Sequence, residues 1–229
     1  MIYFKYLLEL NELMLKTHKE LHEIEEFPHY DIYTPIVCND VIIHERFDKT
    51  IDCYSNILNL MPEDFNKSSI FEVGTNTGYL LLEIKRKNNP GMCVGIDQHD
   101  LILKIPEKIV EIEKLENIEF KVLDIFNDNF DNFDYIIINS VTGAKQKYEN
   151  YNKNINPDAY KPYKEFLDIC IKKTNKSIFT EPTQYGTNKD NYVDIHIDFF
   201  NSFDGIKDAK YLGPTDLKRG RGLFELIIN

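Results

Sequence analysis

IFEVGTNTGY, at residues Ile70–Tyr79, is the most informative segment of this 229-residue chain. Apolar residues lead directly into a turn with two glycines four residues apart, and helix-forming residues follow, which predicts a strand, a tight turn and a helix. Glycine has no Cβ, so a ligand can approach the main chain closely at Gly74 and Gly78. The following helix points unpaired N–H groups and the positive end of its dipole to the same place. We therefore expect a ligand site at this turn.

The spacing of these glycines distinguishes between two kinds of nucleotide ligand. Dinucleotide-binding folds use G-x-G-x-x-G, whose closely spaced glycines let a pyrophosphate sit on the helix N-terminus. Here the pattern is G-x-x-x-G, and a carboxylate, Glu72, precedes it. A carboxylate disfavours a pyrophosphate and suits a ligand with a positive end, such as the α-ammonium of a methionyl group.

Acidic residues also follow the next two predicted strands. Asp97 comes directly after residues 92–96, and Asp124 comes directly after residues 118–123. An acid at the first of these positions can accept hydrogen bonds from both hydroxyls of a ribose. An acid at the second position can accept a hydrogen bond from the exocyclic amine of adenine, while its apolar neighbours cover the adenine ring. Because these acids follow successive strands, we expect them to converge with Glu72 on one edge of the sheet.

Strands and helices alternate from residue 68 onward, which predicts a doubly wound, mostly parallel sheet. The last two strands have no helix between them, so they are expected to pair as an antiparallel hairpin. The polar stretch 143–161 after the fourth strand is typical of a lid, a binding loop or a disordered segment. The predicted strands are 68–73, 92–96, 118–123, 133–139, 177–180, 209–212 and 223–228, and the predicted helices are 78–87, 106–115, 163–173 and 193–203.

The first 65 residues precede this alternation and form a separate N-terminal segment, followed by the α/β domain at 66–229. Apolar residues at helical spacing predict a helix over 3–25, and a second helix is expected over 47–60. Residues 30–45 are expected to be extended and irregular. The N-terminal helices are candidates for a lid or for the face of a homodimer, and the sequence does not decide between these alternatives.

The motifs EVGTNTGY, GID and LDIF, in this order and at these spacings, resemble the class I S-adenosylmethionine-dependent methyltransferases. The resemblance covers residues 66–229 and implies a Rossmann-like seven-stranded sheet with S-adenosyl-L-methionine as cofactor. The middle glycine that is frequent in this family is Asn76 here. The resemblance implies that Glu72, Gly74 and Gly78 hold the methionyl end of the cofactor, Asp97 the ribose hydroxyls and Asp124 with Ile125 the adenine, with Asn139 near the methyl group. Thr75, Asn76 and Gln98 are further candidates for cofactor binding.

Methyl transfer is an in-line displacement on a sulfonium, which an enzyme accelerates mainly by aligning the reacting groups. A general base helps where the nucleophile is a hydroxyl, but no motif in this chain fixes that base. Glu181, directly after the fifth predicted strand, is the best placed candidate, and Asn139 and His44 are the other candidate catalytic residues. Further candidates for the acceptor pocket are His99, Arg46, Lys145 and Tyr148.

The net charge of −11 repels polyanions and disfavours a nucleic-acid substrate. The basic stretches 85–87, 172–173 and 218–221 are the candidates for a local exception, although such runs are more often solvated helix ends or turns. No apolar run approaches the roughly 20 residues that cross a bilayer, and charges interrupt the N-terminal segment, so we expect no membrane partner and a cytoplasmic protein.

The cysteines and histidines do not match a recognised metal-binding pattern. The four cysteines are scattered without a C-x-x-C pair, which predicts reduced thiols. His18 and His22 share a helix face, and His29 is near in sequence, but no carboxylate or cysteine completes a known spacing. We therefore expect no metal site.

Four functions are compatible with these observations. The first is methyl transfer to a small hydroxylated molecule such as a sugar or another metabolite, which the acidic charge and the polar loop favour. The second is methylation or a related modification of RNA, such as tRNA, with the same cofactor. The third is a dinucleotide-dependent oxidoreductase, which the glycine spacing disfavours. The fourth is a binding module that keeps the cofactor fold without turnover.

Overall fold

The computed structural model describes residues 2–23, 31–45, 50–139, 157–182, 192–216 and 220–229. Its helices are α1 (Ile2–His22), α2 (Thr50–Leu60), α3 (Tyr79–Asn88), α4 (Asp100–Glu113), α5 (Pro157–Lys172) and α6 (Tyr192–Asn201). Its strands are β1 (Ile36–Cys38), β2 (Val41–His44), β3 (Ser69–Val73), β4 (Met92–Asp97), β5 (Ile118–Val122), β6 (Phe133–Asn139), β7 (Thr174–Glu181), β8 (Ile206–Asp216) and β9 (Arg221–Ile228).

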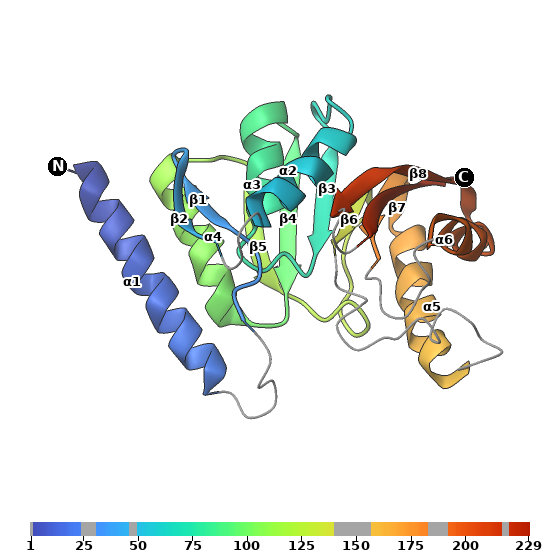
Figure 1. Cartoon of the computed structure of the whole chain (residues 1–229), viewed down its shortest axis with the longest axis horizontal. Helices are drawn as coiled ribbons and strands as arrows, with labels where there is room; N and C mark the ends of the chain where they lie inside the picture. Colours follow the sequence, from blue (N-terminus) through green and yellow to red (C-terminus); the bar gives the residue numbers. More distant parts are fainter. Residues whose placement is uncertain (1, 24–30, 46–49, 140–156, 183–191, 217–219) are drawn as a thin grey trace.

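A seven-stranded sheet forms the centre of the molecule, with the strand order β5-β4-β3-β6-β7-β9-β8 (Figure 1). Strands β3 to β7 pair in parallel, whereas β9 pairs antiparallel with both β7 and β8. Because these strands are parallel, the carboxyl ends of β4, β3, β6 and β7 lie side by side at one edge, and the strand order changes direction between β3 and β6. This arrangement confirms the Rossmann-like sheet and the antiparallel C-terminal hairpin that the sequence predicts.

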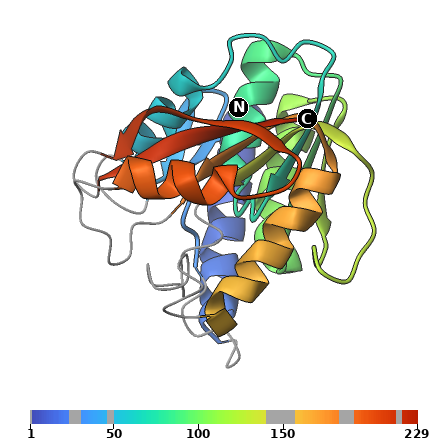
Figure 2. The ribbon, with the colours of Figure 1, turned by 90° about the vertical axis from the view of Figure 1, so that its right-hand side faces the viewer.

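Helices cover both faces of the sheet and bury two separate apolar cores. One core includes Leu10 of α1, Leu80 of α3 and Ile102 of α4. The other includes Leu167 of α5 and Phe200 of α6. In Figure 1, α1 stands beside α4 at one end of the molecule, and Figure 2 shows α6 running along β8 and β9. The inner strands are apolar along most of their length because both of their faces are covered.

The N-terminal segment contains a β-hairpin that the sequence analysis did not anticipate. Strands β1 and β2 pair antiparallel across Asn39 and Asp40, whose φ angles of 47° and 63° lie in the left-handed region. Two consecutive residues with positive φ are typical of a two-residue hairpin turn, and Asn and Asp tolerate that conformation. Residues 36–44 are therefore regular rather than irregular, and the segment 1–65 is not purely helical.

Two helices begin earlier than predicted. Helix α4 starts at Asp100 and carries Pro106 inside it, whereas the prediction placed the helix start at that proline. Ile102, Leu103 and Ile105 are all buried, so packing offsets the backbone hydrogen bond that the proline removes. Helix α5 starts at Pro157, which shortens the predicted linker 143–161, and residues 143–156 lie outside the described part of the chain.

Candidate active site at the carboxyl edge of the sheet

The glycine turn after β3 has the backbone conformation that its sequence requires. Gly74, Asn76 and Gly78 have φ angles of 68°, 52° and 73°, and the turn is closed by the N–H of Gly78, which donates to the carbonyl of Thr75 at 2.8 Å. Asparagine adopts positive φ more readily than most residues, so Asn76 can replace the middle glycine of the motif. A Cβ at Gly78 would lie 2.7 Å from the ring of Phe120, so internal packing requires this glycine.

Asp97 lies directly beside this turn. Its Oδ2 atom accepts a hydrogen bond of 3.0 Å from the main-chain N–H of Asn76, and its Oδ1 atom accepts one of 2.7 Å from the N–H of Gln98. The neighbouring N–H of Thr75 donates to the carbonyl of Ile96 at 2.9 Å. The predicted convergence of the glycine turn and Asp97 on one edge is confirmed.

Glu72 faces into the turn. Its carboxylate accepts a hydrogen bond of 2.5 Å from the hydroxyl of Thr75, and the side chain is 3% exposed. The pKa of Glu72 is raised to about 8, mainly because the carboxyl group is buried; the bonds from Thr75 and from the N–H of Leu81 oppose this shift, and the nearby Asp97 carboxylate adds to it. The site therefore contains a buried carboxyl group that a neighbouring cation would stabilise in its charged form.

Asp124 and Ile125 follow β5, the edge strand next to β4. The N–H of Leu123 donates to the carbonyl of Asp97 at 3.3 Å, which brings this turn to the same edge. The exposed carboxylate of Asp124 accepts from the N–H of Phe126 at 2.9 Å, so it also caps its own turn. Ile125 is buried in a core, whereas the side chain of Phe126 is 51% exposed. Phe126 is therefore better placed than Ile125 to cover a planar ligand.

Residues 31–35 form a cover over the glycine turn that sequence reasoning missed. The side-chain oxygen of Asn76 accepts hydrogen bonds from the N–H groups of Tyr33 at 2.9 Å and Thr34 at 3.1 Å. The hydroxyl of Thr77 donates to the carbonyl of Pro35 at 2.8 Å. The sequence signal for this cover was Asn76 itself, in place of the glycine that is frequent at this position. Unlike glycine, asparagine has a side chain with donor and acceptor atoms that can bond the main chain of another segment.

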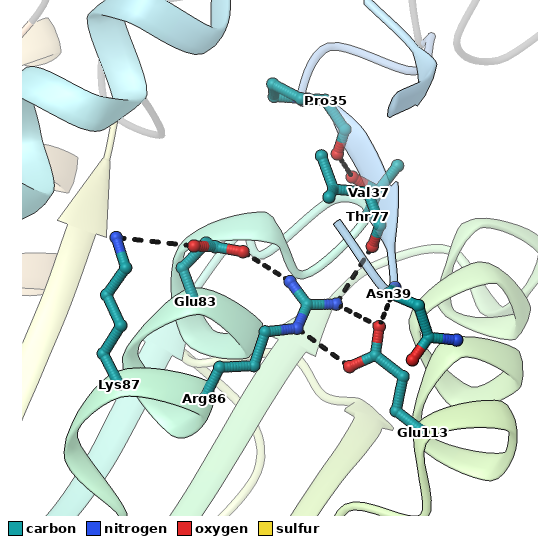
Figure 3. A network of polar contacts seen from close by, with 8 residues as sticks. All are labelled: Pro35, Val37, Asn39, Thr77, Glu83, Arg86, Lys87 and Glu113. Atoms are coloured by element: carbon teal, nitrogen blue, oxygen red, sulfur yellow. Dashed lines mark hydrogen bonds and ion pairs between the residues drawn. The ribbon is translucent and has the colours of Figure 1, made fainter. Parts of the chain in front are cut away.

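Figure 3 shows a second connection between the N-terminal segment and the α/β domain. Arg86 of α3 donates two hydrogen bonds to the carboxylate of Glu113 on α4, at 2.8 and 2.7 Å, and one to the carbonyl of Val37 in β1 at 3.0 Å. Glu113 also accepts from the N–H of Asn39 in the hairpin turn at 2.7 Å. The β1–β2 hairpin is therefore fixed to both helices.

Glu181 and Asn139 are neighbours at the ends of β7 and β6, where they occupy paired positions. Glu181 is buried and accepts a hydrogen bond from the hydroxyl of Thr215, and one of its oxygens lies 3.5 Å from a guanidinium nitrogen of Arg221. A carboxylate paired with arginine holds the guanidinium in a fixed direction. Arg221, which the sequence suggested only as part of the basic stretch 218–221, therefore lies beside Glu181, the candidate catalytic residue.

Tyr54 of α2 lies close to both Glu72 and Glu181. Burial raises its pKa far above the usual range, and the carboxylates of Glu181 and Glu72 both raise it further. Its ring also contacts Tyr79 at the start of α3, with centroids 5.5 Å apart. Helix α2 thus brings a buried tyrosine close to both Glu72 and Glu181.

The remaining predicted candidates are dispersed. His44 ends β2 opposite Ile36, next to the cover segment 31–35, and His99 precedes α4. Arg46, Lys145 and Tyr148 lie outside the described residues.

Each of the three basic stretches includes a residue that makes an internal contact, which in the stretch 218–221 is the ion pair of Arg221 with Glu181. Lys85 is buried and donates to the carbonyl of Pro90 at 3.0 Å, and Lys87 pairs with Glu83. Lys173 donates to the side chain of Asn129 at 3.0 Å. In the third stretch, Lys218 and Arg219 lie outside the described residues.

A family model for a methyltransferase domain matches residues 64–191 of this chain. No sequence among the curated proteins that were compared matches it. Among solved structures, the magnesium protoporphyrin IX methyltransferase of Synechocystis has a TM-score of 0.55 and 9% identity, with 81% of this chain and 90% of that chain covered. The N-terminal domain of EvdMO1, solved with S-adenosylhomocysteine bound, has a TM-score of 0.52 and 14% identity, with coverage of 95% and 81%.

TrmN from Thermus thermophilus has a TM-score of 0.54 and 14% identity, and the match covers 77% of this chain but only 48% of the TrmN chain. At these identities the structural matches establish the fold alone. The family match, which spans more than half of the chain, places the protein among the class I methyltransferases. The chain belongs to the methyltransferase domain family, and it is an S-adenosylmethionine-dependent methyltransferase. Within the described residues, every helix is too short or too polar to cross a membrane.

Proposed function

We propose that this methyltransferase binds S-adenosylmethionine across the carboxyl ends of β3, β4 and β5, with Asp97 receiving the ribose hydroxyls. The observation that carries this proposal is the position of Asp97, whose carboxylate is fixed by the N–H of Asn76 at the edge of the glycine turn. A carboxylate held by main-chain donors keeps its charge and direction, and it can still accept further hydrogen bonds from two adjacent hydroxyls.

The methionyl end and the adenine end of the cofactor need different binding groups, and residues on either side of Asp97 can supply both. The methionyl ammonium needs negative charge, and the buried carboxyl group of Glu72 lies inside the turn from Gly74 to Gly78. The adenine needs a polar acceptor and an apolar surface, which Asp124 and the exposed ring of Phe126 supply after β5. When bound, the cofactor supplies an activated methyl group on its sulfonium, and we assign Asn139, at the end of β6 beside β3, to the surroundings of that methyl group.

We further propose a small hydroxylated molecule, such as a sugar or another metabolite, as the acceptor. Glu181, Thr215 and the partly buried Arg221 form a polar cluster next to Asn139, and the buried Tyr54 lies close to both Glu181 and Glu72. Enclosed clusters of this type suit a ligand that is desolvated on several sides and held by directed hydrogen bonds. Within this cluster we assign Glu181 the role of orienting Arg221 rather than that of general base.

An RNA acceptor receives less support. Non-specific affinity for RNA comes from lysine and arginine side chains that are available to phosphates. The charges of Lys85, Arg86 and Lys87 are engaged by Pro90, Glu113 and Glu83, and they stand near the end of α3 that is remote from the glycine turn. The net charge of −11 also disfavours binding to RNA.

Calorimetric titration with S-adenosylmethionine, and separately with NAD, tests the cofactor site. We expect saturable binding of S-adenosylmethionine and none of NAD. Transfer of a labelled methyl group is then measured on a panel of sugars and hydroxylated metabolites and on tRNA. Labelling of tRNA alone would overturn the acceptor proposal, and cofactor binding without transfer to any acceptor would favour a binding module.

The variant Arg221→Met separates the two proposals. It removes the guanidinium beside Glu181, so it should raise the KM for the acceptor and leave the affinity for S-adenosylmethionine unchanged. Lys210→Met, on the neighbouring strand β8 with a 53% exposed side chain, is the matched control and should change neither quantity. An equal effect of the two substitutions would contradict the assigned role of Arg221.

A further inference from the structure

A group of potential metal ligands lies at the end of α1, outside the region that the family model matches. His18 and His22 are four residues apart and therefore share one face of the helix. Asp31, which follows the helix in the chain, places its carboxylate against both rings. Its Oδ1 atom lies 2.9 Å from Nδ1 of His18 and 3.9 Å from Nε2 of His22. The two imidazole rings meet edge to face, with centroids 4.5 Å apart.

We infer that His18, His22 and Asp31 bind a divalent transition-metal ion, with zinc as the expected occupant. One ligand atom from each residue can be chosen so that all lie within 4.8 Å of one another. Two imidazole nitrogens and one carboxylate oxygen are ligands that zinc accepts, each at about 2.0–2.2 Å. Ligand atoms on a tetrahedral ion at such distances are about 3.3–3.5 Å apart, so small rotations of these side chains suffice.

The surroundings of the three side chains favour an ion with an open coordination position. His18 and His22 are 51% and 46% exposed, so water can complete the coordination, whereas Asp31 is only 12% exposed. The carboxylate of Asp31 is also oriented by the N–H of Ile32, which donates to it at 2.7 Å. The three ligands surround the C-terminal end of α1, where the negative end of the helix dipole attracts a cation. Geometry, charge and solvent access therefore agree.

The consequence of metal binding follows from the position of Asp31. The carbonyl of Asp31 accepts a hydrogen bond from the side chain of Asn76 at 3.0 Å, so the same residue contacts both the metal ligands and the glycine turn. An ion at this site would fasten α1 to the cover segment 31–35. The role of the ion would be to hold the cover segment in place rather than to take part in methyl transfer. The inference of this metal site does not depend on which acceptor the enzyme methylates.

The test uses the full chain without an affinity tag, after treatment with a chelator. Zinc is titrated calorimetrically, and Co²⁺ is titrated by visible absorption, which reports its coordination. We expect one equivalent of either ion to bind. The bound Co²⁺ should show the visible d–d absorption bands of a low coordination number, without a thiolate-to-cobalt charge-transfer band. Such a band would place the ion at a cysteine and would overturn the inference.

Two variants identify the ligands. Asp31→Asn keeps an oxygen for the N–H of Ile32 but loses the charge, and His22→Ala removes a half-exposed ring. Loss of an outer-shell partner already lowers metal affinity about 10–100-fold, so each variant should lose at least about 100-fold. The control is Lys19→Ala, an exposed residue on α1, which should keep the affinity of the parent protein. Unchanged zinc affinity in both ligand variants, or no binding by the parent protein, would refute the site.

Discussion

The side-chain amide of Asn76 donates a hydrogen bond to the main-chain carbonyl of Asp31 at 3.0 Å, across a sequence separation of 45 residues. The oxygen of the same amide accepts from the N–H groups of Tyr33 and Thr34. One side chain in the cofactor turn therefore satisfies three main-chain groups of the cover segment 31–35. A buried main-chain group that loses its partner is costly, so this contact determines where the cover lies.

The substitution Asn76→Gly isolates this contact. Glycine accepts the φ angle of 52° at this position, so the backbone of the turn is kept while the side-chain hydrogen bonds are lost. We expect a loss of about 1–3 kcal/mol in the free energy of unfolding, because each net hydrogen bond contributes about 1 kcal/mol. Amide hydrogen exchange should accelerate at residues 32–34 in particular.

Asn89→Gly is the control for this prediction. Asn89 is exposed and follows α3 with a φ angle of 43°, so the same exchange of residues acts at a similar backbone conformation. It should change stability by less than about 0.5 kcal/mol. Equal exchange rates at residues 32–34 in the Asn76 variant and in the parent protein would show that the cover is held by other contacts.

Much of the fold could be predicted from the sequence because its signals are local. All seven strands of the main sheet were placed from apolar runs between helical patterns, and the order of EVGTNTGY, GID and LDIF indicated the edge where the site forms. Asp97 was placed beside the turn because parallel neighbours end at the same edge, and its bond to Asn76 confirms that inference. The early start of α4 was missed because proline usually marks a boundary, whereas buried neighbours tolerate Pro106 inside the helix.

The parts that were missed depend on contacts between distant residues. The basic stretch 85–87 looked like a candidate for binding phosphate, yet Arg86 bonds Glu113 and Val37, which come from α4 and β1. The sequence shows Asn76 only as a departure from the family's middle glycine, because the main-chain groups that its side chain bonds follow α1, far away in the sequence. The carboxylate that joins the His18–His22 pair is Asp31, at a spacing that no established motif contains. Only the folded chain brings these groups together.

Arg86 is expected to contribute substantially to stability. Its side chain is 17% exposed and that of Glu113 is 7% exposed, so Arg86→Met would leave a nearly buried carboxylate without its charged partner. Removal of one member of such a pair typically costs about 3 kcal/mol or more, measured as the free energy of unfolding in denaturant. Lys87→Met is the control, since Lys87 is 59% exposed and pairs only with Glu83 among the residues drawn in Figure 3. A similar loss in both variants would contradict a structural role of the Arg86 network.

Asp97→Asn tests the ribose assignment. Asparagine keeps one oxygen for the N–H of Asn76 but loses the charge that strengthens hydrogen bonds to two hydroxyls. A hydrogen bond to a charged group contributes about 1.5–3 kcal/mol, so the affinity for S-adenosylmethionine should fall about 10–100-fold in calorimetry. Asp131→Asn, in an exposed loop, should bind like the parent protein. An undiminished affinity in the Asp97 variant, with the fold intact, would remove Asp97 from the cofactor site.

Glu72 predicts a pH dependence that can be measured in two ways. Burial raises the pKa of its carboxyl group in the folded protein from an ordinary 4.5 to about 8. Between these values the folded chain binds more protons than the unfolded chain, so this group contributes stability that is complete below pH 4.5 and is lost as the pH rises through about 8. In Glu72→Gln, which cannot ionise, the melting temperature should fall less steeply with pH over the same interval.

The same proton connects Glu72 to the cofactor. If the ammonium of S-adenosylmethionine approaches this carboxyl group, it favours the ionised form, so binding at pH 7 should release part of a proton to the solvent. Calorimetry in buffers with different ionisation enthalpies measures this release, which should disappear in Glu72→Gln and diminish in the parent protein well above pH 8. A release that persists in the variant would assign the proton to another group and would leave Glu72 with the structural role that its bond to Thr75 already gives it.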